Sequence, residues 1–270
     1  MDVSNMKVAE NVQYTERGLT FTQHGSWGFY TDDSGRTVIP FGFSDKFSDD
    51  DQNIIKGHMD KMSSEIGCIQ FQYVDLDEYK HLENDDKFAT GILFAKRGGC
   101  YSALGYAPGF GFPNEFHDHA PTTWQIISLD NKSCPETSSR SVMHEVMHAL
   151  GFSHEHSRPD REQYINFYAE NTNYASQFEA LPEKFWDPSG HDFELGSVMT
   201  YCSMCGAKNS QKVSSENAVM TTKGGELFGS SPRMTTTDVL QIQHRYCSNL
   251  SDYLKPHAEC ESKDLVGNKF

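Results

Sequence analysis

The 270-residue sequence has no long hydrophobic run and comparatively few basic residues. No stretch of about 18 apolar residues is present, so the sequence predicts no membrane-spanning helix. Lys and Arg together number 23 against 38 Asp and Glu, which gives a formal net charge of −15. Because nucleic acids and anionic membrane surfaces are bound through clustered basic side chains, this balance argues against both as partners.

Internal repeats, low-complexity tracts and Pro-, Gly- or Ser-rich linkers are also missing. The length and the ordinary share of apolar residues are typical of one folded domain, which can be split into two lobes around a cleft. Residues 1–13 are polar throughout and contain no apolar core of a signal peptide, so we expect that any native leader is missing from this sequence.

Seven cysteines are spread along the chain, and only Cys202 and Cys205 form a C-x-x-C pair. Wide spacing predicts disulfides and an oxidising compartment, with one thiol left over. The alternative is a reduced set of buried cysteines. A second zinc site at the C-x-x-C pair is not expected, since no matching pair exists elsewhere. The other cysteines are Cys68, Cys100, Cys134, Cys247 and Cys260.

Hydrophobic spacing predicts a helix that begins at Ser48 and ends at Gly67, with acidic residues in its first turn. Four short apolar segments bounded by turn residues predict strands of a twisted sheet. A further helix is predicted near the C-terminus. The apolar stripe of the first helix is Ile54, Ile55, Met59, Met62 and Ile66, the strands are 37–43, 69–74, 90–95 and 125–129, and the last helix is 237–246.

Another predicted helix, over residues 138–150, carries the strongest chemical signal in the sequence. His144 and His148 lie four residues apart in an H-E-x-x-H motif, which places their imidazoles on one helical face at a separation that one zinc ion can bridge. Glu145 follows the first histidine directly, where its carboxylate can accept a proton from a zinc-bound water instead of binding the metal.

A third histidine extends this motif to H-E-x-x-H-x-x-G-x-x-H. His154 follows His148 by six residues, and Gly151 between them allows the positive φ of a sharp turn back to the metal. Three neutral nitrogen ligands leave zinc an open position for water, which is typical of a catalytic site. A single histidine is usually a surface or core residue, but five specified residues in a helix-forming segment favour a metal site.

The sequence around and beyond this motif resembles the astacin family of metzincin endopeptidases. The resemblance spans roughly residues 25–248. The matching segments are His154 to Arg161, Ser197 to Tyr201, Val38 to Phe41, Gly98 to Ser102 and Arg245 to Cys247.

That resemblance implies an α+β fold of the metzincin type with two lobes. It implies a twisted, mostly parallel sheet with an antiparallel edge strand, an active-site helix, and an irregular C-terminal lobe that ends in a helix. The catalytic domain is expected over residues 25–248, with an upper lobe of about 25–154 and a lower lobe of about 155–248. Residues 1–24 are then an N-terminal extension or prosegment remnant, and 249–270 a C-terminal tail.

The same resemblance implies roles for individual residues. The expected ligands of one catalytic Zn²⁺ are His144, His148, His154 and Tyr201, and the expected catalytic residues are Glu145 and Tyr201. Tyr201 would bind the resting zinc and then turn to the tetrahedral intermediate. Met199 would pack beneath the imidazoles. Glu155 resembles the carboxylate that anchors the mature N-terminus, which is expected near Gly25.

Disulfide pairing is a further implication of the resemblance. It implies that Cys68 pairs with Cys247 and that Cys100 pairs with Cys134. We interpret Cys202 and Cys205, which follow Tyr201 directly, as a local disulfide at the rim of the cleft.

Together these features predict a secreted, zinc-dependent endopeptidase, a hydrolase that cleaves peptide bonds in proteins through a zinc-bound water activated by Glu145. Its substrates would be proteins or peptides that pair with an edge strand expected from Thr90 to Tyr101. Lys208 or Lys212 is a candidate for favouring acidic side chains after the scissile bond. The alternative is a catalytically inert, zinc-containing interaction module of the same fold, which the intact set of ligands and base disfavours. A non-peptidase hydrolase is a weaker alternative.

Overall fold

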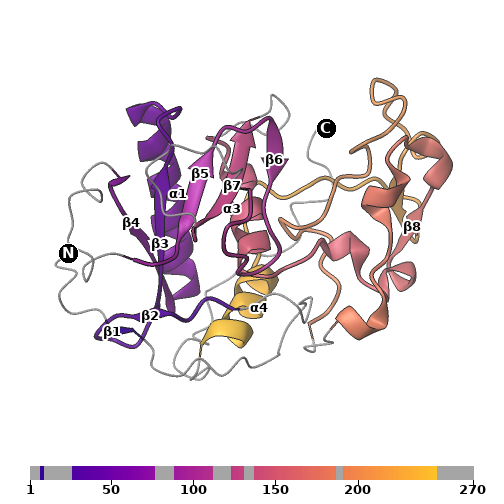
Figure 1. Ribbon diagram of the computed structural model, residues 1–270. Helices are drawn as coiled ribbons and strands as arrows, with labels where there is room; N and C mark the ends of the chain where they lie inside the picture. The colour runs from indigo at the N-terminus through magenta and orange to yellow at the C-terminus, as the bar shows by residue number, and fades with distance from the viewer. Residues whose placement is uncertain are drawn as a thin grey trace.

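The computed structural model shows two lobes (Figure 1). One contains the sheet with α1, α3 and α4, and the other is largely irregular and contains β8. No helix among the described residues combines the length and apolar character needed to cross a membrane. The described residues are 7–8, 26–76, 88–111, 123–130, 137–186 and 191–247.

The central sheet is mixed, with a parallel middle and antiparallel pairings at its margins. β3 (Thr37–Phe43) lies between β4 (Ile69–Tyr73) and β5 (Ile92–Ala95) and is parallel to both. β7 (Gln125–Asp130) continues the parallel order beside β5, and β6 (Gly99–Tyr101) pairs antiparallel with β7. The remaining strands of this sheet extend it beside β3: β2 (Tyr30–Thr31) pairs antiparallel with β3, and β1 (Lys7–Val8) pairs antiparallel with β2.

The expectation of one continuous edge strand from Thr90 to Tyr101 is wrong. The segment forms two strands, of which β5 is interior and only β6 is the edge partner of β7. Gly98 and Gly99 both have positive φ, at 73° and 104°, so the chain turns between the two strands. The sequence offered this signal in its Gly-Gly pair.

Helix α1 (Asp49–Ile66) begins and ends where its capping residues predict. The Ser48 hydroxyl accepts a hydrogen bond from the Asp51 amide at 3.2 Å, and Gly67 ends the helix with a φ of 84°. One residue of the predicted stripe is outside the core, because Ile54 is 45% exposed. The others, Ile55, Met59, Met62 and Ile66, are completely buried.

Helices α3 (Ser139–Ala149) and α4 (Thr236–Tyr246) complete the main core. Apolar residues of α1, α3, α4 and the sheet form one buried cluster. The Tyr246 hydroxyl donates to the Leu150 carbonyl at 2.9 Å, which joins the ends of the two helices. The predicted Cys68–Cys247 disulfide is confirmed and ties the residue before β4 to the end of α4.

The second lobe has little regular structure. Its only ladder in the described residues is β8 (Ile165–Phe167) paired antiparallel with β9 (Met220–Thr222). Its own small core contains Ile165, Phe178, Val219, Met220 and Phe228. Its single-turn 3₁₀ helices are Glu155–Ser157, Arg161–Gln163, Ala169–Asn171, Ala175–Phe178 and Glu183–Phe185. The predicted α+β, two-lobed metzincin-like fold with an irregular C-terminal lobe is therefore confirmed.

Candidate active site

The three motif histidines meet at one point between the lobes. Helix α3 places His144 and His148 one turn apart, and Gly151, with a φ of 100°, turns the chain so that His154 returns to them. The Nε2 atom of His154 lies 3.2 Å from that of His148 and 3.3 Å from that of His144. These residues form a group able to hold one metal ion.

The hydrogen bonds of the Nδ1 atoms of His144 and His148 decide which tautomer each of these two rings adopts. His144 Nδ1 lies 2.9 Å from the Val198 carbonyl, and His148 Nδ1 lies 2.7 Å from the Phe152 carbonyl. Since a carbonyl only accepts, each Nδ1 carries the proton and each Nε2 presents a lone pair. Burial lowers the pKa of all three imidazoles, that of His148 to about 4, so the rings are neutral. Lone pairs that converge in this way fit a divalent zinc ion.

Glu145 is buried beside the histidines, and its Oε2 atom has no hydrogen-bond partner among the described residues. Burial raises the pKa of its carboxyl group to about 8, and the positive charge of Arg140 opposes that rise. Because a buried carboxyl oxygen without a partner is costly, its presence here is typical of a group reserved for chemistry. Its pKa near neutrality suits proton exchange.

Tyr201 lies next to two of the motif histidines, and the expected packing of Met199 beneath the imidazoles stays a prediction. The Tyr201 ring centroid is 4.6 Å from that of His154, and the half-buried phenol has a pKa raised by burial and by the charge of Glu145. The Tyr201 amide donates to His156 Nδ1 at 3.2 Å. Met199 is 2% exposed and belongs to the same apolar cluster as the core of α3.

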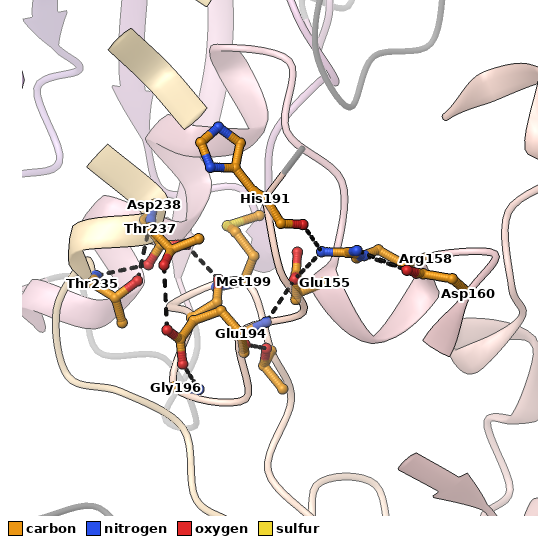
Figure 2. A network of polar contacts seen from close by, with 12 residues as sticks. Glu155, Arg158, Asp160, His191, Glu194, Gly196, Met199, Thr235, Thr237 and Asp238 are labelled. Carbon is orange, nitrogen blue, oxygen red and sulfur yellow. Dashed lines mark hydrogen bonds and ion pairs between the residues drawn. The ribbon is translucent and has the colours of Figure 1, made fainter. Parts of the chain in front are cut away.

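A buried carboxylate on α4 fixes the loop that precedes Tyr201 (Figure 2). Asp238 accepts hydrogen bonds from the Ser197 hydroxyl at 2.6 Å and from the Val198 amide at 3.0 Å. It also closes a capping box with Thr235. Since the Val198 carbonyl contacts His144, Asp238 orients that imidazole indirectly. This residue was not predicted from the sequence, although the T-x-x-D pattern at the helix start was a visible signal.

Glu155 lies in a second polar network, also drawn in Figure 2. Its Oε1 atom accepts from Arg158 Nη1 at 2.8 Å and from the Glu194 amide at 3.0 Å, while Arg158 forms a bidentate contact with Asp160. Burial raises the pKa of Glu155 to about 7 against the opposing charge of Arg158. Gly25, the expected start of the mature chain, lies outside the described residues, so its approach to Glu155 stays a prediction.

A cleft of about 420 Å³ opens beside His148 and His154. The segment after β6 contributes Ser102 and Leu104 to its lining, and residues 176–182 contribute most of the rest. The two candidate specificity lysines, Lys208 and Lys212, are not among the residues that line it. Lys208 instead donates to the Glu170 carbonyl at 2.7 Å. The expected preference for acidic side chains therefore stays a prediction.

Cysteine pairing near the site follows the expectation where the structure describes it. Cys202 and Cys205 form the predicted local disulfide directly after Tyr201. Cys100 is disulfide-bonded, and its predicted partner Cys134 lies outside the described residues. Cys260 lies outside them as well.

Comparison with known proteins agrees with this geometry. The family model described as Astacin, a peptidase family, matches residues 32–247, so the chain belongs to the astacin family. It is 25% identical over 235 residues to zinc metalloproteinase nas-6 of Caenorhabditis elegans, covering 85% of this chain and 58% of the relative. It is 26% identical over 215 residues to the low choriolytic enzyme of Oryzias latipes, covering 79% of this chain and 66% of the relative.

A solved structure extends the likeness to the fold. High choriolytic enzyme 1, a hatching enzyme zinc-protease from Oryzias latipes, superposes with a TM-score of 0.63 at 21% identity, covering 87% of this chain and 98% of that one. The chain spans 58%, 29% and 43% of the lengths of nas-6, nas-14 and nas-5, three curated relatives from Caenorhabditis elegans that it matches.

Proposed function

We propose that the chain is a secreted zinc endopeptidase that hydrolyses peptide bonds in proteins, with His144, His148 and His154 as ligands of one catalytic Zn²⁺. The observation that carries this proposal is the convergence of three histidine Nε2 atoms beside the unpartnered carboxyl oxygen of Glu145. Membership of a peptidase family supports the reaction class. The disulfides support an oxidising, extracellular location.

Glu145 acts as the proton carrier in this proposal. When bound, zinc supplies Lewis-acid activation of a water molecule and of the scissile carbonyl. Glu145 takes one proton from the attacking water as the new C–O bond forms, and it returns that proton to the amine nitrogen as the C–N bond breaks. A carboxyl group with a pKa raised by burial suits both transfers.

Tyr201 is proposed to bind zinc in the resting enzyme and to donate a hydrogen bond to the carbonyl oxygen as its charge develops. Its ring lies against that of His154, and burial raises the phenol pKa, which favours the protonated, donating form once the oxygen has left zinc.

Extended peptides are the proposed substrates. Within the described sheet β6 is an end strand, paired on one side with β7, and the chain continues from it into the lining of the cleft. A peptide that adds to this edge would gain main-chain hydrogen bonds and place its side chains in the cleft beside His148 and His154. The catalytic domain is proposed to cover residues 25–248, which the family match over 32–247 supports.

The decisive experiment separates metal binding from turnover. We expect Glu145→Gln to retain one zinc ion per chain and to lower cleavage of a diverse peptide mixture by about 10²- to 10⁴-fold. Chelation of the parent chain should abolish cleavage, and added zinc should restore it. Near-normal turnover in the variant would refute the role of Glu145. A zinc-loaded parent chain without any cleavage would instead support the inert module.

A second variant tests Tyr201. We expect Tyr201→Phe to lower kcat by roughly 10- to 1000-fold with little change in KM, because the hydroxyl acts mainly on developing charge. Steady-state kinetics on one cleaved peptide measure both parameters. A rise in KM alone would identify Tyr201 as a substrate contact.

A further inference from the structure

A pair of histidines outside the candidate active site joins the lower lobe to α4. His191 Nε2 lies 2.7 Å from His244 Nδ1, and their ring centroids are 4.5 Å apart. His244 is exposed in the last turn of α4, and His191 is partly exposed. In Figure 2 the ring of His191 points away from the Glu155–Arg158 ion pair. Dissolved ions therefore reach the two imidazoles from solvent.

The short distance requires that the two rings share one proton, with one nitrogen donating and the other accepting. A second proton in this contact would make two N–H donors face each other without an acceptor. Burial, the neighbouring His244 and the charge of Arg158 lower the pKa of His191, and Asp192 opposes them. Neutral imidazole is the form that binds metals, and the lowered pKa of His191 favours it on that side of the contact.

The motif histidines of this chain give an internal standard for metal geometry. Their Nε2 atoms are 3.2 and 3.3 Å apart, and tetrahedral zinc with bonds near 2.0–2.1 Å separates two nitrogens by roughly 3.3 Å. The His191 and His244 nitrogens would have to separate by about half an ångström for an ion to replace the shared proton. Side chains on the solvent side can make so small a rotation.

Both imidazoles are attached to well-fixed backbone. The carbonyl of His191 accepts from Arg158 Nη1 at 3.3 Å. On α4, Gln243 directly precedes His244, and its Nε2 atom donates to the Ile66 carbonyl at 2.9 Å. Cys247, three residues after His244, is disulfide-bonded to Cys68. Ligands held in this way lose little freedom when an ion binds, which favours affinity.

We propose that His191 and His244 form a second, exchangeable site for a transition-metal ion that prefers imidazole, such as Zn²⁺, Ni²⁺ or Cu²⁺. Calcium and magnesium prefer oxygen ligands and are not expected there. Among the described residues no third ligand group lies within 4.8 Å of both nitrogens, so water completes the coordination. The site is therefore weaker than one with three buried imidazoles, and an ion bound there would link the segment that begins at His191 to α4.

Counting ions per chain tests this site directly. The zinc-loaded full chain is dialysed against excess Zn²⁺ at about pH 7.5, where neutral imidazole predominates, and bound zinc is measured by elemental analysis. We expect His191→Gln and His244→Gln each to bind one ion fewer than the parent chain. His58→Gln is the matched control, because that partly buried imidazole contacts only the Thr137 carbonyl in the described residues, and it should bind as many ions as the parent.

Thermal unfolding gives a second readout that does not depend on activity. Excess Zn²⁺ should raise the melting temperature of the zinc-loaded parent and of His58→Gln, and should leave both pair variants unchanged. Equal zinc counts in the parent and both pair variants would overturn the proposal, as would loss of the ion in only one of them. Absence of peptidase activity would leave these counts unaffected, so failure of the proposed function is distinguishable.

Discussion

The upper lobe fixes His144 and His148 by packing α3 against α1 and the sheet, whereas the lower lobe fixes Tyr201 and its neighbours through buried polar side chains. In the upper lobe the residues around the metal site are mostly apolar and completely buried. The corresponding supports of the lower lobe are Glu155 and Arg158 within it and Asp238, which reaches its loop from α4, and each makes several hydrogen bonds. The two halves of one candidate site thus depend on different interactions.

That difference predicts different responses to substitution. Apolar packing is shared among many contacts, so the loss of one side chain removes part of the support. A buried ion pair depends on both partners, and removal of one leaves an uncompensated charge. We therefore expect the lower lobe to be sensitive at a few polar positions and the upper lobe to depend on its core and its long-range disulfide.

The two described disulfides give the largest expected contrast. Cys68 and Cys247 are 179 residues apart and Cys202 and Cys205 only three, so the long bridge restricts the unfolded chain far more. Replacing the first pair by alanine should lower the free energy of unfolding by about 5 kcal/mol, and replacing the second pair by about 2 kcal/mol. Urea unfolding of the two double variants measures both. Equal losses would show that loop length does not decide their contributions.

A single substitution in the buried ion pair should have the next largest effect. Arg158→Met leaves Glu155, whose side chain is 2% exposed, without its cation, and should cost about 3–5 kcal/mol in the free energy of unfolding. The matched control is Lys61→Met on α1, which breaks an exposed pair with Glu65 and should cost about 0–1 kcal/mol. Similar costs for the two variants would remove the proposed contrast between the lobes.

The same contrast explains which parts of the fold the sequence predicted. β3 has its predicted bounds, residues 37–43, and α3 lies within one residue of its prediction at each end, because capping and apolar spacing are local signals. The motif histidines also lie within eleven residues of each other. Their convergence needs only one helix and one turn, so sequence spacing was sufficient to predict it.

The long-range hydrogen bonds that these polar side chains make had no comparable signal. Asp238 meets Ser197 across 41 residues, and the Glu194 amide meets Glu155 across 39, through chain with little periodic structure. Such contacts depend on tertiary placement, which neither propensity nor hydrophobic pattern encodes. Ile54 is a residue for which the local pattern made a wrong prediction, since it fits the apolar spacing of α1 and is nevertheless exposed.

For each pH unit, acid sensitivity is the smallest of these three effects, and we expect part of it to originate in the lower lobe. His156 is completely buried and accepts a hydrogen bond from the Tyr201 amide, and burial lowers its pKa from 6.5 to about 3. Between these two values the unfolded chain binds a proton that the folded chain does not. Its contribution to stability is therefore complete above pH 6.5 and is lost as the pH falls toward 3.

Each buried histidine with a pKa lowered in this way should reduce the free energy of unfolding by about 1.4 kcal/mol for every pH unit of acidification within that range. Urea unfolding at intervals between about pH 8 and pH 4 measures how steeply the free energy of unfolding depends on pH. His156→Asn should reduce this slope by the equivalent of about one bound proton, and above about pH 7 the free energy should stay nearly constant. The metal-site histidines contribute similarly in both proteins, so the difference between the two slopes isolates His156. If the slopes coincide, the acid sensitivity originates in the α3 imidazoles, and the lower lobe is then the less acid-sensitive of the two.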